Sequence, residues 1–276
     1  MLLTDYPLFD AHFHVIDPRF PLVPNRGYLP DRYTVSDYKE RVKGYDLRGG
    51  AVVSGSFQAF DQDYLVDALQ RLGPAFVGVT QLPASVDDEE LRELHGYGVR
   101  AVRFNLKRGG SEDVSRLDGM ARRIHALLGW HVELYIDARE LQPLRTMLAA
   151  LPAVAIDHLG LSKEGLPHLL WLAERGVRVK ASGFGRVDFD VRDALKDLYA
   201  ANPASLMFGD TNSARELLQS LRYSPDVHSA AIYGRDRQQF VRYLIPGHNI
   251  PASLDILQEQ ITYGIEYVSL VQPIVH

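Results

Sequence analysis

Cysteine is absent from the 276-residue sequence. The chain can therefore form neither a disulfide framework nor a metal site built on thiolates. An excess of positive charge is also missing, because 30 lysines and arginines face 35 aspartates and glutamates, which gives a formal net charge of −5. This balance argues against nucleic acid as a partner, since proteins that bind it present strongly basic surfaces.

Long hydrophobic runs are lacking as well. No stretch reaches the roughly 18 uncharged apolar residues that a membrane-spanning helix needs. Residues 1–6 do not lead from a basic segment into an apolar one, as a signal peptide would. We therefore expect a cytoplasmic protein without a membrane partner. A hydrophobic content of 46% with 24% charged residues is typical of a globular chain with a sizeable core.

Short apolar runs rich in β-branched residues alternate along the chain with longer amphipathic stretches. We predict eight strands, beginning near Leu8, Ala51, Phe76, Val99, Val132, Val154, Val177 and Leu206. Helical patterns lie between them, for example at residues 61–72, 87–98 and 117–128. This alternation predicts parallel strands with helices outside. Eight such units favour a closed (β/α)₈ TIM barrel of the α/β class over an open doubly wound sheet.

The chain is expected to be a single domain over residues 1–276, because no linker or low-complexity segment divides it. Residues 211–276 are less regular than the rest. They contain helical patterns at residues 213–221, 235–244 and 252–261, which prolines separate. We interpret this part as an atypical helical tail.

The first predicted strand carries candidate catalytic residues. Side chains alternate along a strand, so Asp10, His12 and His14 are expected to share one face. Two imidazoles at this spacing can hold one divalent cation or hydrogen-bond one substrate. His158 ends the sixth strand, and in a barrel the catalytic residues lie at such carboxyl ends. We expect it to join His12 and His14.

The eighth strand leads into Asp210, which is placed to take a proton from water. The alternative role for this carboxylate is to cap the following helix. If a metal ion is bound, the sequence indicates His12, His14 and Asp210 as its ligands.

Cationic side chains gather near strand ends in a chain that is acidic overall. Arg103 lies on the fourth strand, Lys180 on the seventh, and Arg186 follows the seventh. Arginine binds carboxylates through two parallel hydrogen bonds, so this group predicts an anionic substrate. Ser56 and Tyr135, which end the second and fifth strands, could donate to a substrate carbonyl or hydroxyl. Each could equally be an ordinary residue of the barrel mouth.

Five segments together resemble the amidohydrolase-2 group of the amidohydrolase superfamily. They are FDAHFHV at 9–15, GVRAVRFNL at 98–106, LGWHVELYI at 128–136, VAIDHLG at 154–160 and VKASGFGRV at 179–187. Within that group they look most like the lactonase branch, which includes 2-pyrone-4,6-dicarboxylate lactonases and sugar-acid lactonases.

The resemblance implies roles for individual positions. The family's HxH pair matches His12 and His14, and its sixth-strand histidine matches His158. Its fourth-strand arginine matches Arg103. Its seventh-strand Lys-x-Ser-Gly pattern and the arginine after it match Lys180, Ser182, Gly183 and Arg186. In dicarboxylate lactonases such positions bind the substrate, polarise the lactone carbonyl and activate water without a required metal. Other members of the superfamily bind zinc or manganese. The implied cofactor is therefore none, or one divalent zinc or manganese ion.

The eighth strand departs from the family pattern, which is usually Gly-[Thr/Ser]-Asp-x-Pro. Here Asp210 directly follows Gly209, so the carboxylate stands one residue early. On a regular strand that shift would turn the side chain to the opposite face. We therefore expect the chain to leave strand geometry at Gly209, whose missing Cβ permits a turn.

Taken together, these features predict a hydrolase that opens a carboxylated or sugar-acid lactone. Asp210 would activate water, while His12, His14 and His158 polarise the carbonyl. The predicted partner is a small anionic or polyhydroxy substrate, and the chain could also pair as a homodimer. The alternatives are a metal-dependent hydrolase or decarboxylase of the same superfamily, and a catalytically inactive barrel that binds an anion.

Overall fold

The computed structural model describes residues 7–25, 27, 29–202 and 206–208, and four short strands further along the chain. By its internal contacts the chain divides into two compact units, Met1–Asp210 and Thr211–His276. The division falls where the sequence becomes less regular. The chain thus comprises a larger and a smaller compact unit.

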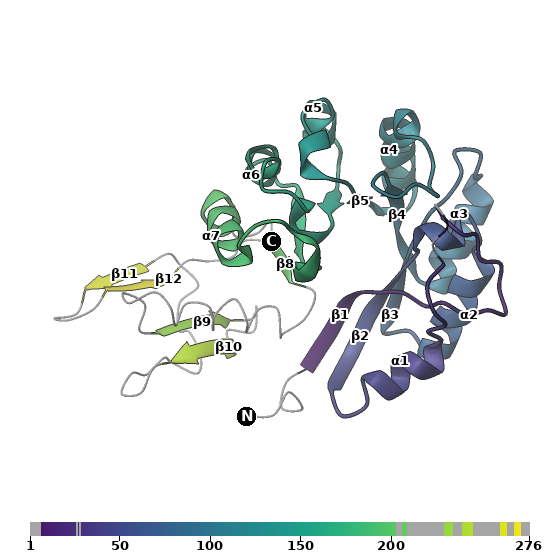
Figure 1. The fold of residues 1–276 in the computed structure, drawn as a ribbon, viewed down its shortest axis with the longest axis horizontal. Helices are drawn as coiled ribbons and strands as arrows, with labels where there is room; N and C mark the ends of the chain where they lie inside the picture. The colour runs from purple at the N-terminus through teal and green to yellow at the C-terminus, as the bar shows by residue number, and fades with distance from the viewer. Residues whose placement is uncertain are drawn as a thin grey trace. The chain divides into compact units, whose positions relative to one another are not determined.

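The first unit is built on an eight-stranded sheet in which strand order follows chain order (Figure 1). Its strands are β1 (Pro7–Phe13), β2 (Asp46–Val53), β3 (Phe76–Thr80), β4 (Val99–Asn105), β5 (His131–Tyr135), β6 (Val154–Ile156), β7 (Arg178–Ala181) and β8 (Leu206–Phe208). Every pair of neighbouring strands is parallel. The predicted α/β fold with eight parallel strands is confirmed.

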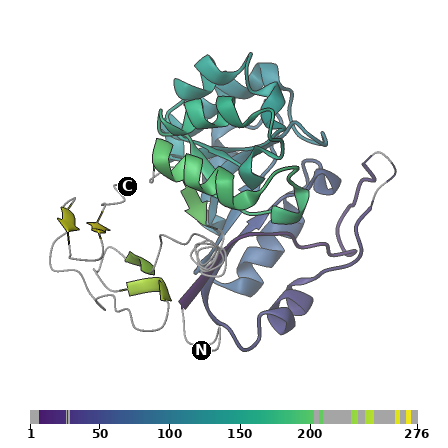
Figure 2. The same ribbon diagram turned by 60° about the vertical axis from the view of Figure 1, so that its left-hand side comes forward.

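Helices alternate with these strands and lie on the outer side of the curved sheet in both views (Figures 1 and 2). The α-helices are α1 (Val35–Arg41), α2 (Asp63–Leu72), α3 (Asp88–Tyr97), α4 (Leu117–Leu128), α5 (Arg145–Ala149), α6 (Leu166–Ala173) and α7 (Val191–Ala201). Short 3₁₀ helices are η2 (Ser56–Gln58), η3 (Val114–Arg116), η4 (Ala138–Glu140), η5 (His158–Gly160) and η6 (Phe184–Arg186). Among the described residues, no helix combines the length and apolar character that crossing a membrane requires.

Helix α3 shows how local sequence sets these elements. The Asp87 side chain accepts hydrogen bonds from the backbone N–H groups of Glu89 and Glu90 and so caps the helix. Such a cap stabilises a helix by about 1 kcal/mol. Leu91 and Leu94, one turn apart, are the buried face. A regular amphipathic pattern therefore becomes a helix packed on the sheet.

The interior of the sheet changes in character from one end to the other. Strands β2, β3 and β4 contribute a buried apolar cluster of Ala51, Val53, Val79 and Ala101. Arg103 follows Ala101 by two residues and therefore shares its face. In the neighbouring strand, Glu133 is in register with Arg103. Charged side chains thus replace apolar ones toward the carboxyl ends of the strands.

The second unit contains strands where we predicted helices. Strand β9 (Ser229–Tyr233) pairs with β10 (Gln239–Leu244), and β11 (Gln260–Tyr263) pairs with β12 (Val268–Val271), both antiparallel. The helix predicted over 235–244 is wrong for the six residues of β10, and the helix predicted over 252–261 is wrong at its end, which enters β11. Phe, Val and Tyr favour strands when a partner strand is present, and pairing overrides a short helical pattern. Residues 213–221 lie outside the described part of the chain.

Candidate active site

The structure brings the three predicted histidines together at the carboxyl ends of the strands. The ring of His12 lies 5.1 Å from that of His14 and 4.8 Å from that of His158, measured between centroids. Two of the rings are held by hydrogen bonds through Nδ1, His14 to the Val53 carbonyl at 2.7 Å and His158 to the Ser182 hydroxyl at 3.0 Å. Rings held in this way keep their orientation before any ligand arrives.

All three imidazoles are neutral at physiological pH. Burial, and after it the charge of Arg103, lowers the pKa of His14 to about 4. Burial also lowers the pKa of His158 to about 4, although Asp157 acts in the opposite sense. The pKa of His12 is lowered well below its ordinary value by burial and then by Lys180. A neutral imidazole offers one N–H donor and one acceptor nitrogen.

The turn after β6 directs two consecutive side chains to the same place. Asp157 and His158 both approach His12, with potential ligand atoms within 4.8 Å of one another. On a regular strand they would face opposite sides. Here the backbone enters the left-handed region at His158 (φ 52°), Leu159 (φ 52°) and Leu161 (φ 70°). Left-handed residues other than glycine are strained and concentrate at functional sites.

Strand β1 departs from the predicted alternation in its second half. The register with β2 shifts between Asp10 and Phe13. Asp10 accepts a hydrogen bond from the Tyr38 hydroxyl at 3.3 Å, and the Phe13 ring stacks on the same tyrosine. Tyr38 belongs to α1, so Asp10 lies with Phe13 toward the outer layer. The expectation that Asp10 shares the face of His12 is wrong, because the irregularity breaks the two-residue period.

Beneath the histidines lies a buried group of four charged side chains. Arg103 donates to Glu133 at 2.5 Å through Nη1 and lies 2.7 Å from Asp157 through Nη2. Lys180 donates to the other carboxylate oxygen of Glu133 and lies 3.7 Å from Asp157. All four side chains are at most 3% exposed. Burial acts to raise the pKa of Asp157, but Arg103 and Lys180 together hold it below its ordinary value.

The buried group includes two residues, Arg103 and Lys180, that the sequence predicted to bind the substrate. Arg103 and Lys180 are interior side chains whose charges are balanced by two carboxylates. Sequence reasoning missed Glu133 and assigned no role to Asp157. A signal for Glu133 was available, since it is a charged residue in an otherwise apolar strand, level with Arg103. Asp157 carried no such signal, because its direction depends on the left-handed turn.

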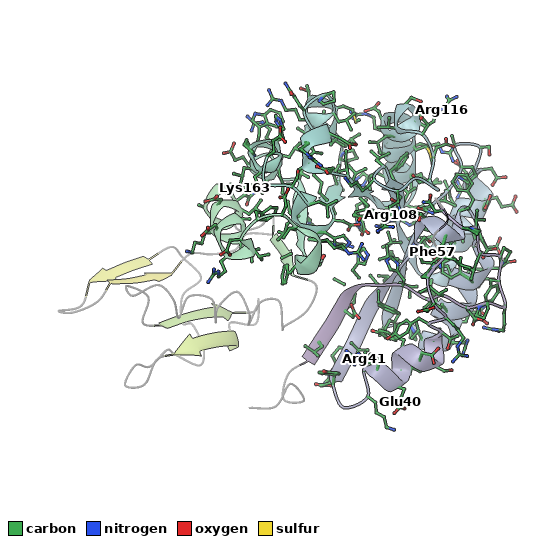
Figure 3. The ribbon with its side chains drawn as sticks, viewed as in Figure 1. Glu40, Arg41, Phe57, Arg108, Arg116 and Lys163 are labelled. Carbon is green, nitrogen blue, oxygen red and sulfur yellow. The ribbon has the colours of Figure 1, made fainter. Side chains whose placement is uncertain are left out.

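The other predicted residues lie around the histidines. The Tyr135 ring meets the His158 ring edge-on at 5.4 Å, and its hydroxyl is 3.4 Å from Nη1 of Arg186. Arg186 is exposed on η6. Ser56 is buried in η2 and precedes Phe57. Figure 3 labels Phe57, and also Arg108, which follows β4. Asp210 lies outside the described residues, two positions beyond the end of β8.

The described residues offer one group that could hold a metal ion, formed by His12, Asp157 and His158. It shares only His12 with the predicted ligands His12, His14 and Asp210. In residue type the group suits zinc. Within the described part of the chain, Nε2 of His12 is buried without a hydrogen-bond partner.

Charge does not fit a resident divalent ion. Asp157 already lies beside Arg103 and Lys180, and Glu133 completes a balanced set of two positive and two negative groups. Two positive unit charges 4 Å apart repel by about 4 kcal/mol at an effective dielectric constant of about 20. A metal ion here would face both cations, so no step of the chemistry below is assigned to one.

Eight parallel strands alternating with helices, with neutral histidines and buried ion pairs at their carboxyl ends, define a (β/α)₈ protein with a polar site at the strand ends. A family model described as amidohydrolase matches residues 9–218, and the chain belongs to this family. A second model, described as a periplasmic sensor domain, matches residues 198–276.

Two curated relatives show the lactone-hydrolase side of the family. A 2-pyrone-4,6-dicarboxylate hydrolase of Comamonas testosteroni is 35% identical over 156 residues, covering 55% of this chain and 51% of the relative. A 4-sulfomuconolactone hydrolase of Rhizobium radiobacter is 28% identical over 161 residues, covering 55% and 52%. The chain therefore spans about half the length of the curated relatives it matches.

A solved structure resembles the chain over a longer stretch. It is named as a 2-pyrone-4,6-dicarboxylic acid hydrolase from Pseudomonas putida and is 30% identical, with a TM-score of 0.60. The match covers 76% of this chain and 82% of the other.

Proposed function

We propose that this chain is a hydrolase that opens lactones bearing a carboxylate or a similar acidic group. The observation that carries the proposal is the set of three neutral imidazoles gathered at the strand ends, with an exposed arginine beside them. Both curated relatives are named for hydrolases of acidic lactones, one a dicarboxylate and the other a sulfonate. Their names support the same substrate class for this chain.

Lactone opening begins with attack of water on the ring carbonyl carbon. Negative charge then develops on the carbonyl oxygen, and the ring C–O bond breaks to give a carboxylate and a hydroxyl group. Neutral imidazole N–H groups can stabilise that oxygen, and each well-placed donor contributes roughly 3–4 kcal/mol in known enzymes. His12, His14 and His158 are the proposed donors.

The base that removes a proton from water is proposed to be Asp210. Strand β8 ends at Phe208, so Asp210 follows the end of this strand by two residues. Catalytic residues of a barrel occupy such positions after the carboxyl ends of the strands. Asp157 suits this role less well, because it is fully buried and its pKa is held low by Arg103 and Lys180. A carboxylate stabilised as an anion is a weak acceptor for a proton.

The acidic group of the substrate is proposed to bind Arg186. Arg103 and Lys180 are committed to Glu133 and Asp157, whereas Arg186 is exposed and has one weak polar contact, to Tyr135, among the described residues. An exposed guanidinium close to neutral histidines suits recognition of a carboxylate. Ser56, Tyr135 and Ser182 are further polar groups for the substrate.

A metal-dependent hydrolase is the second candidate, favoured by the grouping of His12, Asp157 and His158. A cytoplasmic location and a homodimer are further proposals that rest on the sequence.

The proposal is tested by assaying the purified chain against a panel of lactones with and without acidic groups. We expect turnover of acidic lactones, abolished by Asp210→Asn while substrate binding persists. Binding of acidic lactones without turnover of any would favour the inactive anion-binding barrel. Turnover that needs an added divalent ion would favour the metal-dependent candidate.

A further inference from the structure

Lys180 uses all of its hydrogen-bonding capacity inside the protein. An ammonium group has three N–H donors and no acceptor. Its Nζ atom donates to the Glu133 carboxylate, to the Ala11 carbonyl at 3.3 Å and toward Nδ1 of His12 at 3.5 Å. These are three contacts for three donors, and the side chain is 3% exposed. Lys180 is therefore equipped to act on His12 and not on a substrate.

The contact between Lys180 and His12 determines where the imidazole carries its proton. Because the ammonium can only donate, a hydrogen bond between the two side chains requires Nδ1 of His12 to be the accepting nitrogen. A neutral imidazole then carries its proton on Nε2. In the opposite tautomer an N–H on Nδ1 would point at the positive charge of Lys180 at 3.5 Å, while the neighbouring carboxylates of Asp157 and Glu133 lie slightly further from Nδ1, at 3.6 and 3.8 Å.

The resulting N–H is the group that the proposed reaction requires. Nε2 of His12 is buried and has no hydrogen-bond partner among the residues that the structure describes. A buried donor without a partner costs stability. Such a cost is explained when the donor serves a ligand, here the oxygen on which charge develops.

Glu133 keeps Lys180 in this position. It is fully buried on β5, with one carboxylate oxygen on Arg103 and the other on Lys180. The rigid Arg103 guanidinium orients the carboxylate, and the carboxylate in turn orients the ammonium. The chain of contacts runs from β4 through β5 and β7 to β1.

Resting on the function proposed above, we propose that Glu133 and Lys180 are positioning residues that hold His12 as the Nε2–H tautomer, ready to donate to the lactone carbonyl oxygen. Lys180 then supports the chemistry through His12 and does not bind the acidic group of the substrate.

Nitrogen-15 NMR of the full-length chain, labelled at histidine, tests this directly. His12 is assigned by the signals lost in His12→Gln. We expect its Nε2 to be protonated and its Nδ1 to be unprotonated in the unsubstituted protein. His95 is an internal reference, because its Nδ1 accepts from the indole N–H of Trp130 at 2.9 Å and must likewise leave the proton on Nε2. A His12 proton on Nδ1 would overturn the proposal without any variant.

Lys180→Met tests the cause. The His12 signals should move toward a mixture of tautomers, while those of His95 stay unchanged. With an acidic lactone, kcat should fall by about 10²-fold, with KM little changed. Lys180→Arg should restore part of both effects. A wild-type His12 pattern in Lys180→Met, or a rise in KM confined to acidic lactones, would contradict the proposal.

The NMR result stands apart from the proposed function. If the tautomer pattern is as expected but no lactone is hydrolysed, the lactonase proposal fails and the positioning role of Lys180 and Glu133 stands. If lactones are hydrolysed and the pattern is reversed, the positioning inference alone fails. Should Lys180→Met not fold, the unsubstituted protein and Lys180→Arg still decide the matter.

Discussion

Burial changes what a charged side chain can do, and the arginines of this protein show it. Arg103 is 2% exposed and forms ion pairs with two buried carboxylates, whereas Arg186 is exposed and contacts a tyrosine hydroxyl. Both match cationic positions of the family pattern. Sequence alone places both near the site but does not say which charge is already neutralised. Arg186 is therefore the cation that we propose binds an acidic substrate.

Replacing Arg186 with methionine should therefore weaken binding of acidic lactones. A charge-assisted hydrogen bond contributes roughly 1.5–3 kcal/mol, so KM for acidic lactones should rise about 10-fold to 100-fold. Neutral lactones should be nearly unaffected. Arg116→Met, an exposed arginine on η3, is the matched control and should change neither. Equal losses on acidic and neutral substrates would show that Arg186 has a structural role.

Gly183 leaves space for the ring of His158. A Cβ atom there would lie 2.6 Å from the His158 ring, and the backbone is left-handed with φ +66°. Gly183→Ala should thus displace His158 and lower kcat. Gly176→Ala separates the two causes, because Gly176 also has a positive φ (+88°) but no atom within 4 Å of the added carbon.

Measuring the free energy of unfolding and the turnover of both glycine variants separates backbone strain from displacement of His158. Each should lose about 1–2 kcal/mol of stability from the strained backbone, and only Gly183→Ala should lose activity. Full activity in both variants would mean that His158 tolerates displacement.

At the scale of elements, strand alternation was predictable and local irregularity was not. Apolar periodicity located all eight strands, and the two-residue period put His12 and His14 together. The same period failed at Asp10, where β1 shifts register, and gave no hint of the left-handed turn that brings Asp157 beside His158. Such irregularities depend on packing between distant segments. The least predictable parts of the strands are therefore those that build the site.

The loop after β5 is held by one carboxylate. Asp137 accepts from Lys107 at 2.7 Å, from Ser162 at 2.7 Å and from Arg139 at 3.0 and 2.7 Å, which ties together the ends of β4, β5 and β6. The hydrogen bonds from Arg139 hold the pKa of Asp137 far below its ordinary value, although burial opposes them. The folded state therefore favours the ionised carboxylate.

Asp137→Asn should lower the free energy of unfolding at pH 7 by about 2–3 kcal/mol, because hydrogen bonds to a charged group are lost. A depressed carboxylate pKa stabilises the fold fully above the unfolded value near 4, and this stabilisation is lost progressively as the pH falls from there toward the folded pKa. Urea unfolding should show the same difference at pH 7 and pH 5, narrowing below about pH 4.

Asp46→Asn is the control for this measurement, since Asp46 has a similar contact with the arginine two residues on but lies at the surface. It should leave stability unchanged. If the difference in unfolding free energy between the unsubstituted protein and Asp137→Asn widened in acid, the depressed pKa of Asp137 could not be its cause.

At the scale of the whole molecule, the chain combines a barrel unit predicted closely from sequence with a second unit predicted poorly. Alternating strands and helices repeat over two hundred residues, and a repeated pattern is robust to local error. Within residues 211–276 the predicted elements are short, and a segment of six residues such as 239–244 has a pattern compatible with either a helix or a strand. Only the partner strand decides between them.

The central proposal is that neutral imidazoles promote the opening of acidic lactones without a resident metal ion. The most direct measurement is the rate at which the full chain hydrolyses 2-pyrone-4,6-dicarboxylate before and after extensive treatment with a chelator. We predict hydrolysis at the same rate in both samples, because the charges around His12, Asp157 and His158 are already balanced. Activity that disappears with the chelator and returns with zinc or manganese, or no hydrolysis in either sample, would contradict the account.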